Sequence, residues 1–96
     1  MTLKQLVYEH RSEILAIARR HGAADIRLFG SAVRGAERPE SDLDFLVQME
    51  RGRSLLDLGG QLMDLQQLLG RHVDVVTAAG LQPERRDEVL QESLPV

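Results

Sequence analysis

Hydrophobic positions along the chain follow a helical spacing in two stretches. Within residues 2–21 and again within 54–69, apolar side chains recur at steps of three and four, which is typical of an amphipathic helix. The first stripe is interrupted at His10 and Arg11, and we expect one helix over residues 2–21. Pro83 suits the first position of a helix, and a last helix is expected over residues 83–92.

Three shorter stretches alternate apolar and polar residues and predict strands. They are residues 25–29, 42–48 and 72–77. Gly30 and Ser31 break the first strand, and Ser31 is expected to N-cap a short helical turn.

The order of these elements is helix, strand, turn, strand, helix, strand, helix. This order predicts an α/β (α+β) fold in one domain over residues 1–96, with a mixed sheet of three or more strands and helices packed on one face. The opposite face of the sheet is expected to be open.

Composition narrows the function classes. The net charge of −3 argues against a broad nucleic-acid-binding face, which needs a basic excess. Because there is no cysteine, disulfides and thiolate metal sites are excluded. No apolar run approaches the roughly 20 residues of a membrane span, and the N-terminus lacks a signal-peptide apolar block. We therefore expect a cytoplasmic protein that binds neither membrane nor nucleic acid directly.

Three aspartates occupy predicted strands. Period-two spacing puts Asp42 and Asp44 on one face, and Asp74 lies within the β-branched third strand, which would bring it near them if the two strands are neighbours. Carboxylates this close repel each other, and a hard divalent cation such as Mg²⁺ reverses that cost. The alternative is a solvated Asp-x-Asp at a strand start, with Asp74 as an ordinary exposed residue.

The residues after the first strand are suited to an anion. Gly30 permits close backbone approach, Ser31 begins a helical turn whose free N–H groups favour phosphate, and Arg34 adds a charge. The alternative is that the Gly-Ser pair is only a cap. We also expect His10, His21 and His72 to be ordinary surface or strand-edge residues, and the segment 83–89 to be a solvated helix face rather than a partner patch.

The pattern Gly30-Ser31, ten residues, Asp42-Leu43-Asp44 and a later Asp74 resembles the nucleotidyltransferase superfamily that includes DNA polymerase beta and kanamycin nucleotidyltransferase. Over residues 25–81, the string is most similar to the minimal nucleotidyltransferases, the MNT antitoxins of HEPN–MNT toxin–antitoxin pairs.

This resemblance implies a polymerase beta-like nucleotidyltransferase fold and a Mg²⁺-dependent enzyme with catalytic and metal-binding residues Asp42, Asp44 and Asp74. The first two would bind two Mg²⁺ ions; Asp74 would ligate the catalytic metal and help activate the attacking hydroxyl. It also implies that Gly30 and Ser31 hold the triphosphate of ATP, assisted by Arg34.

The implied reaction transfers AMP from ATP to a tyrosine of a partner HEPN ribonuclease toxin and neutralises it. Since the sequence ends at Val96, we expect the acceptor to be on another protein. Two alternatives remain open: a non-catalytic antitoxin that masks its partner, and nucleotidyl transfer to a small-molecule acceptor. Nucleotide preference, number of AMP units and stoichiometry are not encoded by this pattern.

Overall fold

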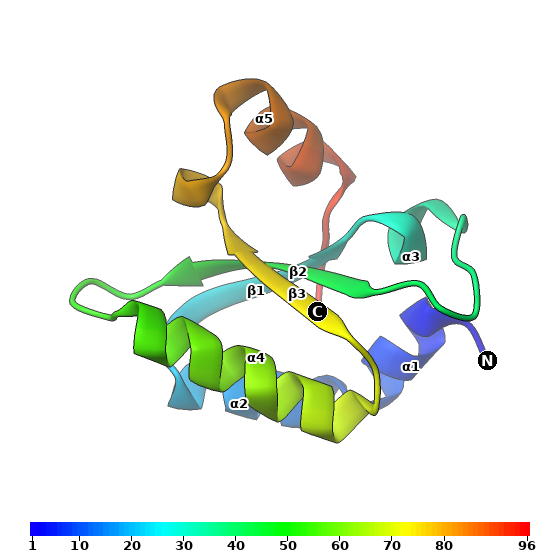
Figure 1. The fold of residues 1–96 in the computed structure, drawn as a ribbon, viewed down its shortest axis with the longest axis horizontal. Helices are drawn as coiled ribbons and strands as arrows, with labels where there is room; N and C mark the ends of the chain where they lie inside the picture. The colour runs from blue at the N-terminus through cyan, green and yellow to red at the C-terminus, as the bar shows by residue number, and fades with distance from the viewer.

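A four-stranded mixed sheet organises the chain in this computed structural model, which describes residues 1–96 (Figure 1). Its order is β3-β2-β1-β4, with β2 antiparallel to β1 and parallel to β3, and β4 antiparallel to β1. The strands are β1 Ala23–Phe29, β2 Leu43–Met49, β3 Val73–Thr77 and β4 Leu94–Pro95. The α/β fold class with a mixed sheet is confirmed, and β4 is an addition too short to show any alternation in the sequence.

Helices α1 (Leu3–Glu9), α2 (Arg11–Arg20) and α4 (Leu55–Leu69) lie on one face of this sheet, and α5 (Pro83–Glu92) lies on the other (Figure 1). The other helical elements are α3 Ser31–Arg34 and the 3₁₀ turn η1 Ala78–Gly80. The main core joins the inward side chains of β2, such as Phe45, to Ile14 of α2 and Leu65 of α4. No helix is both long enough and apolar enough to cross a membrane.

The single helix expected over residues 2–21 is wrong, because the chain breaks at His10. There φ is −102° and ψ is 21°, which ends α1 and begins α2. The His10 ring Nδ1 lies 3.0 Å from the carbonyl oxygen of Leu6. Each helix buries its own apolar residues, Leu3 and Val7 in α1 and Ile14 in α2, so the interruption in the stripe marks a true boundary.

The second face of the sheet is not fully open, in contrast to the expectation. Leu46 follows Phe45 on β2 and so points to the opposite face. There it forms a small buried cluster with Phe29 and with Val89 of α5. These apolar side chains need cover, and α5 supplies it over part of the face. The remainder of that face carries the acidic residues.

Candidate active site

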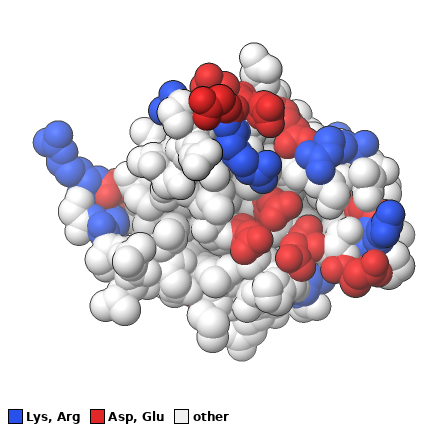
Figure 2. All heavy atoms as spheres, turned by 45° about the horizontal axis from the view of Figure 1, so that its top comes forward, with Lys and Arg blue, Asp and Glu red and all other residues white.

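Pairing of two strands sets Asp44 beside Asp74. In the parallel β2–β3 ladder, Asp44 is the direct partner of Asp74, so both side chains leave the same face of the sheet. Asp44 is half-buried and Asp74, on the edge strand, is exposed. Asp42 precedes β2, and its Oδ1 lies 3.5 Å from Nδ1 of the exposed His72. Acidic side chains gather on this face with Lys and Arg side chains around them (Figure 2).

The carboxyl group of Asp44 is harder to ionise than that of an ordinary aspartate, because its pKa is raised. Its pKa is raised from 3.8 to about 6, first by burial and then by the charges of Asp74 and Asp42. Arg85 and Arg34 oppose this rise, and no hydrogen bond contributes to it. The position of Asp44 therefore makes its ionised form unfavourable, and a bound cation would remove that electrostatic penalty.

The donor chemistry of these aspartates fits Mg²⁺, which prefers one or two carboxylates together with phosphate and water oxygens. Asp44 and Asp74 supply two such carboxylates side by side. The three aspartates do not gather round one point as a group of three ligands, and the Asp42 carboxylate lies toward His72 instead. Asp42 would have to turn from His72 to join them.

Gly30 is required by the position of Asp44. Its backbone has φ 83° and ψ −156°, and a Cβ atom built there would lie 2.2 Å from Oδ2 of Asp44. Phe29 is the partner of Asp44 across the β1–β2 ladder, so Gly30 leaves the strand directly beside the carboxylate. A side chain at position 30 would therefore collide with Asp44 in addition to straining the backbone.

Ser31 does not cap α3, contrary to the expectation. Gly30 occupies the N-cap position and makes no side-chain cap bond, whereas Ser31 is the first residue of the helix. The carbonyl oxygen of Gly30 accepts hydrogen bonds from the backbone N–H groups of Val33 and Arg34, at 3.0 and 3.2 Å. The turn is thus defined by the backbone of the glycine rather than by the serine hydroxyl.

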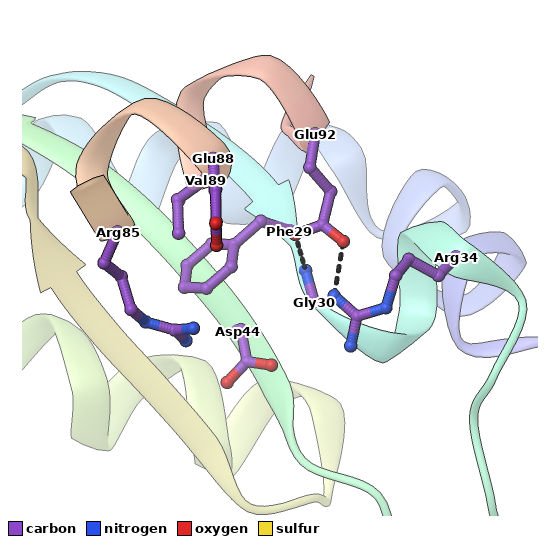
Figure 3. Close-up of a pocket in the computed structure, with 8 residues that line it drawn as sticks. All are labelled: Phe29, Gly30, Arg34, Asp44, Arg85, Glu88, Val89 and Glu92. Atoms are coloured by element: carbon purple, nitrogen blue, oxygen red, sulfur yellow. Dashed lines mark hydrogen bonds and ion pairs between the residues drawn. The ribbon is translucent and has the colours of Figure 1, made fainter.

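A cavity of about 250 Å³ opens beside Asp44, between the sheet, α3 and α5 (Figure 3). Arg34 pairs there with Glu92, and the backbone N–H of Gly30 donates to the same carboxylate at 3.3 Å. The guanidinium of Arg85 extends from α5 toward Asp44 (Figure 3). The cavity is lined by Phe29, Gly30, Arg34, Asp44, Arg85, Glu88, Val89 and Glu92. The cavity therefore brings the Asp44 carboxylate of β2 together with Arg34, Arg85 and the turn that begins at Gly30.

Sequence reasoning missed the contribution of α5. The segment 83–89 was expected to be a solvated face, yet Arg85 and Val89 line the cavity, as does Glu92 one turn further on. These three positions are spaced by four and three residues and so share one helix face. That spacing was readable in the sequence, but it did not reveal that the face would cover the site.

Known proteins resemble this chain over nearly all of its length. Residues 11–96 match the family described as "Nucleotidyltransferase domain". A Methanocaldococcus jannaschii protein named "Putative protein adenylyltransferase" is 36% identical over 90 residues, covering 94% of this chain and 97% of the relative. "Protein adenylyltransferase MntA" of Thermococcus cleftensis is 34% identical over 90 residues, covering 94% of this chain and 88% of its own length.

Solved structures share the fold. One described as "Structure of putative minimal nucleotidyltransferase" superposes with a TM-score of 0.88 at 44% identity, covering 100% of this chain and 97% of that one. A second, described as "Crystal structure of the toxin-antitoxin with AMP-PNP", has a TM-score of 0.74 at 21% identity, covering 88% of this chain and 69% of that one, and supports the fold alone. With the family match over residues 11–96, these findings confirm the predicted resemblance: the structure matches that described for a minimal nucleotidyltransferase, and the chain belongs to the nucleotidyltransferase domain family.

Proposed function

We propose that this chain is a Mg²⁺-dependent protein adenylyltransferase that moves AMP from ATP to a tyrosine of a HEPN ribonuclease toxin and so acts as its antitoxin. The observation that carries the proposal is the direct pairing of Asp44 with Asp74. Beside this pair, the Asp44 carboxylate fills the space that a side chain at Gly30 would need. The names of the two relatives, both protein adenylyltransferases, support a protein as the acceptor.

Asp42, Asp44 and Asp74 would hold the metal. When bound, Mg²⁺ supplies positive charge to the entering and departing oxygens of the phosphoryl transfer. Asp44 is the half-buried member and fixes the position of the site, whereas Asp74 lies exposed on the edge strand. Asp74 is therefore the carboxylate most open to an acceptor hydroxyl, and in this proposal it would take up the proton of that hydroxyl.

The triphosphate would lie along the cavity between α3 and α5. Its oxygens would accept from the backbone N–H of Gly30 and from Arg34, with Ser31 at the start of α3 beside them. Arg85 extends toward Asp44 from the opposite wall and would contribute a further cation (Figure 3). These groups orient the α-phosphorus: the tyrosine oxygen–phosphorus bond forms, the bond to the β-phosphate oxygen breaks, and pyrophosphate leaves.

Transfer of AMP would neutralise a ribonuclease through ordinary electrostatics. The added group is bulky and negatively charged, and RNA is repelled by negative charge at the surface it must approach. A purely masking antitoxin would instead protect without this chemistry, so the two mechanisms give different results when the carboxylate of Asp44 is lost.

The test uses a HEPN ribonuclease as the acceptor protein, ATP labelled on the α-phosphate, and Mg²⁺. The wild type and Asp25→Asn, which removes an exposed carboxylate of β1, should label the toxin, and Asp44→Asn should not. Co-purification of each variant with the toxin shows whether the complex still forms. The proposal fails if the wild type transfers no label, or if Asp44→Asn transfers label as well as the wild type does.

A further inference from the structure

The Glu92 carboxylate binds both donors, the Gly30 N–H and the Arg34 guanidinium, that would bind the nucleotide phosphate. Glu92 Oε2 accepts from the backbone N–H of Gly30 at 3.3 Å, and Oε1 pairs with the guanidinium of Arg34 (Figure 3). The Glu92 side chain is only 20% exposed, whereas that of Arg34 is 58% exposed. The carboxylate thus lies inside the cavity, and the arginine reaches in from its rim.

The position of Glu92 is fixed by the residue that follows it. Ser93 is buried, its hydroxyl accepts from Arg27 Nε at 2.7 Å, and its backbone carbonyl accepts from Arg27 Nη2 at 3.2 Å. The Ser93 hydroxyl also donates to the carbonyl of Leu90 at 3.0 Å, which secures the last turn of α5. With its backbone held this way, Glu92 can leave the cavity only by rotating its side chain or by moving the end of α5.

We propose that Glu92 is an internal substitute for a phosphate group and determines the affinity of the site for nucleoside triphosphates; this rests on the proposed function. Carboxylate and phosphate oxygens are both anionic acceptors and bind the same donors. Gly30 has one N–H, so it serves Glu92 or the nucleotide, but not both at full strength. Nucleotide entry therefore requires Glu92 to give up Gly30 and Arg34.

This exchange has two consequences for the site. Before nucleotide arrives, Arg34 and the Gly30 N–H are already directed at one point, because Glu92 satisfies them. After the reaction, return of Glu92 replaces the departing phosphate and keeps these donors from being left unpaired. Glu92 thus lowers affinity for substrate and favours release of pyrophosphate.

The experiment measures dissociation constants by titration calorimetry for two probes, ATP with Mg²⁺ and inorganic tripolyphosphate. Glu92→Gln keeps the size of the side chain and removes its charge; both probes are expected to bind about three- to tenfold more tightly than to the wild type. Glu84→Gln is the matched control, since it removes the same charge from an exposed position of the same helix but lies outside the cavity and frees neither donor. Its dissociation constants should stay within about twofold of the wild type.

Two further variants make the result decisive. In an Arg34→Ala background, the gain from Glu92→Gln should shrink, because one of the two contested donors is absent. If Glu92→Gln is unfolded at the assay temperature, Glu92→Asp replaces it. This variant keeps the charge but shortens the side chain that reaches the two donors. Wild type that binds ATP while neither Glu92 variant binds it more tightly overturns this inference alone. Failure of the wild type to bind ATP at all overturns the proposed function, and this inference with it.

Discussion

The ionised carboxylate of Asp44 destabilises the folded chain at neutral pH, so Asp44→Asn is expected to be more stable than the wild type. Burial and the charges of Asp74 and Asp42 raise the pKa of Asp44 to about 6, and no hydrogen bond to Asp44 offsets them. Asparagine has nearly the same shape and no charge to repel. The substitution should therefore remove the electrostatic penalty while leaving the packing of β2 unchanged.

The magnitude follows from the change in ionisation on folding. A rise from 3.8 to about 6 corresponds to about 3 kcal/mol when the group is fully ionised. Asp44 is only half-buried, so solvent screening reduces the gain expected from Asp44→Asn to about 1–2 kcal/mol. For a domain of this size that is a rise of roughly 5–10 °C in the midpoint of thermal unfolding.

The gain should depend on pH with a definite sign. Below pH 3.8, Asp44 is protonated in both the folded and the unfolded chain, so its ionisation costs nothing. Between 3.8 and about 6 the unfolded chain loses this proton first, and the folded chain is progressively disfavoured. Above about pH 6 the full penalty is present. The variant should therefore gain little at low pH and most at pH 7 and above.

The assay is urea and thermal denaturation of both proteins at pH 4 and pH 7.5, in EDTA and in excess MgCl₂. Mg²⁺ should raise the stability of the wild type at pH 7.5 and affect the variant much less, because ligand binding to the folded state stabilises it. The reasoning is refuted if Asp44→Asn is no more stable than the wild type at pH 7.5, or if the difference is the same at both pH values.

Other positions give independent tests. Gly30→Ala should lower the unfolding temperature and abolish ATP binding, because φ is 83° and the new Cβ would meet Asp44 at 2.2 Å. Gly35→Ala, with φ 70° and open space around it, should cost only about 1–2 kcal/mol in the same thermal scan; equal effects would argue against the collision. Asp74→Asn should lower the pKa of Asp44 in a carboxyl NMR titration, and an unchanged pKa would show that the two charges do not interact. Ser54→Ala removes the capping box of α4 and should cost about 1 kcal/mol in urea denaturation; no loss would mean that the cap is dispensable.

Features set by local spacing could be predicted from the sequence. The leucine stripe of residues 54–69 gave the position of α4 to within one residue, and Pro83 marked the start of α5. The Asp-x-Asp pattern and Asp74 pointed to one face, and the parallel register of β2 with β3 placed Asp44 beside Asp74 as expected. In each case a periodic pattern or one chemically restrictive residue carried the information.

Features set by packing between distant segments could not be predicted. The break at His10 depends on how α1 and α2 each bury their own apolar residues against the sheet. The pairing of Glu92 with Arg34 joins positions 58 residues apart, and no local signal links them. The face of α5 was legible as a helix face, but its place over Asp44 depends on the burial of Val89 against the sheet.

The missing Cβ of Gly30 ties two positions of the sequence together as the protein diverges. Residue 30 can gain a side chain only where residue 44 has given up the carboxylate that fills the space. Among descendants of this chain, loss of the acid at 44 would remove the collision and leave only the backbone strain at φ 83° to disfavour a side chain at 30, whereas the reverse order of substitutions would pass through a protein that suffers both. In a lineage that has lost the transferase activity, position 44 should be substituted first and position 30 second.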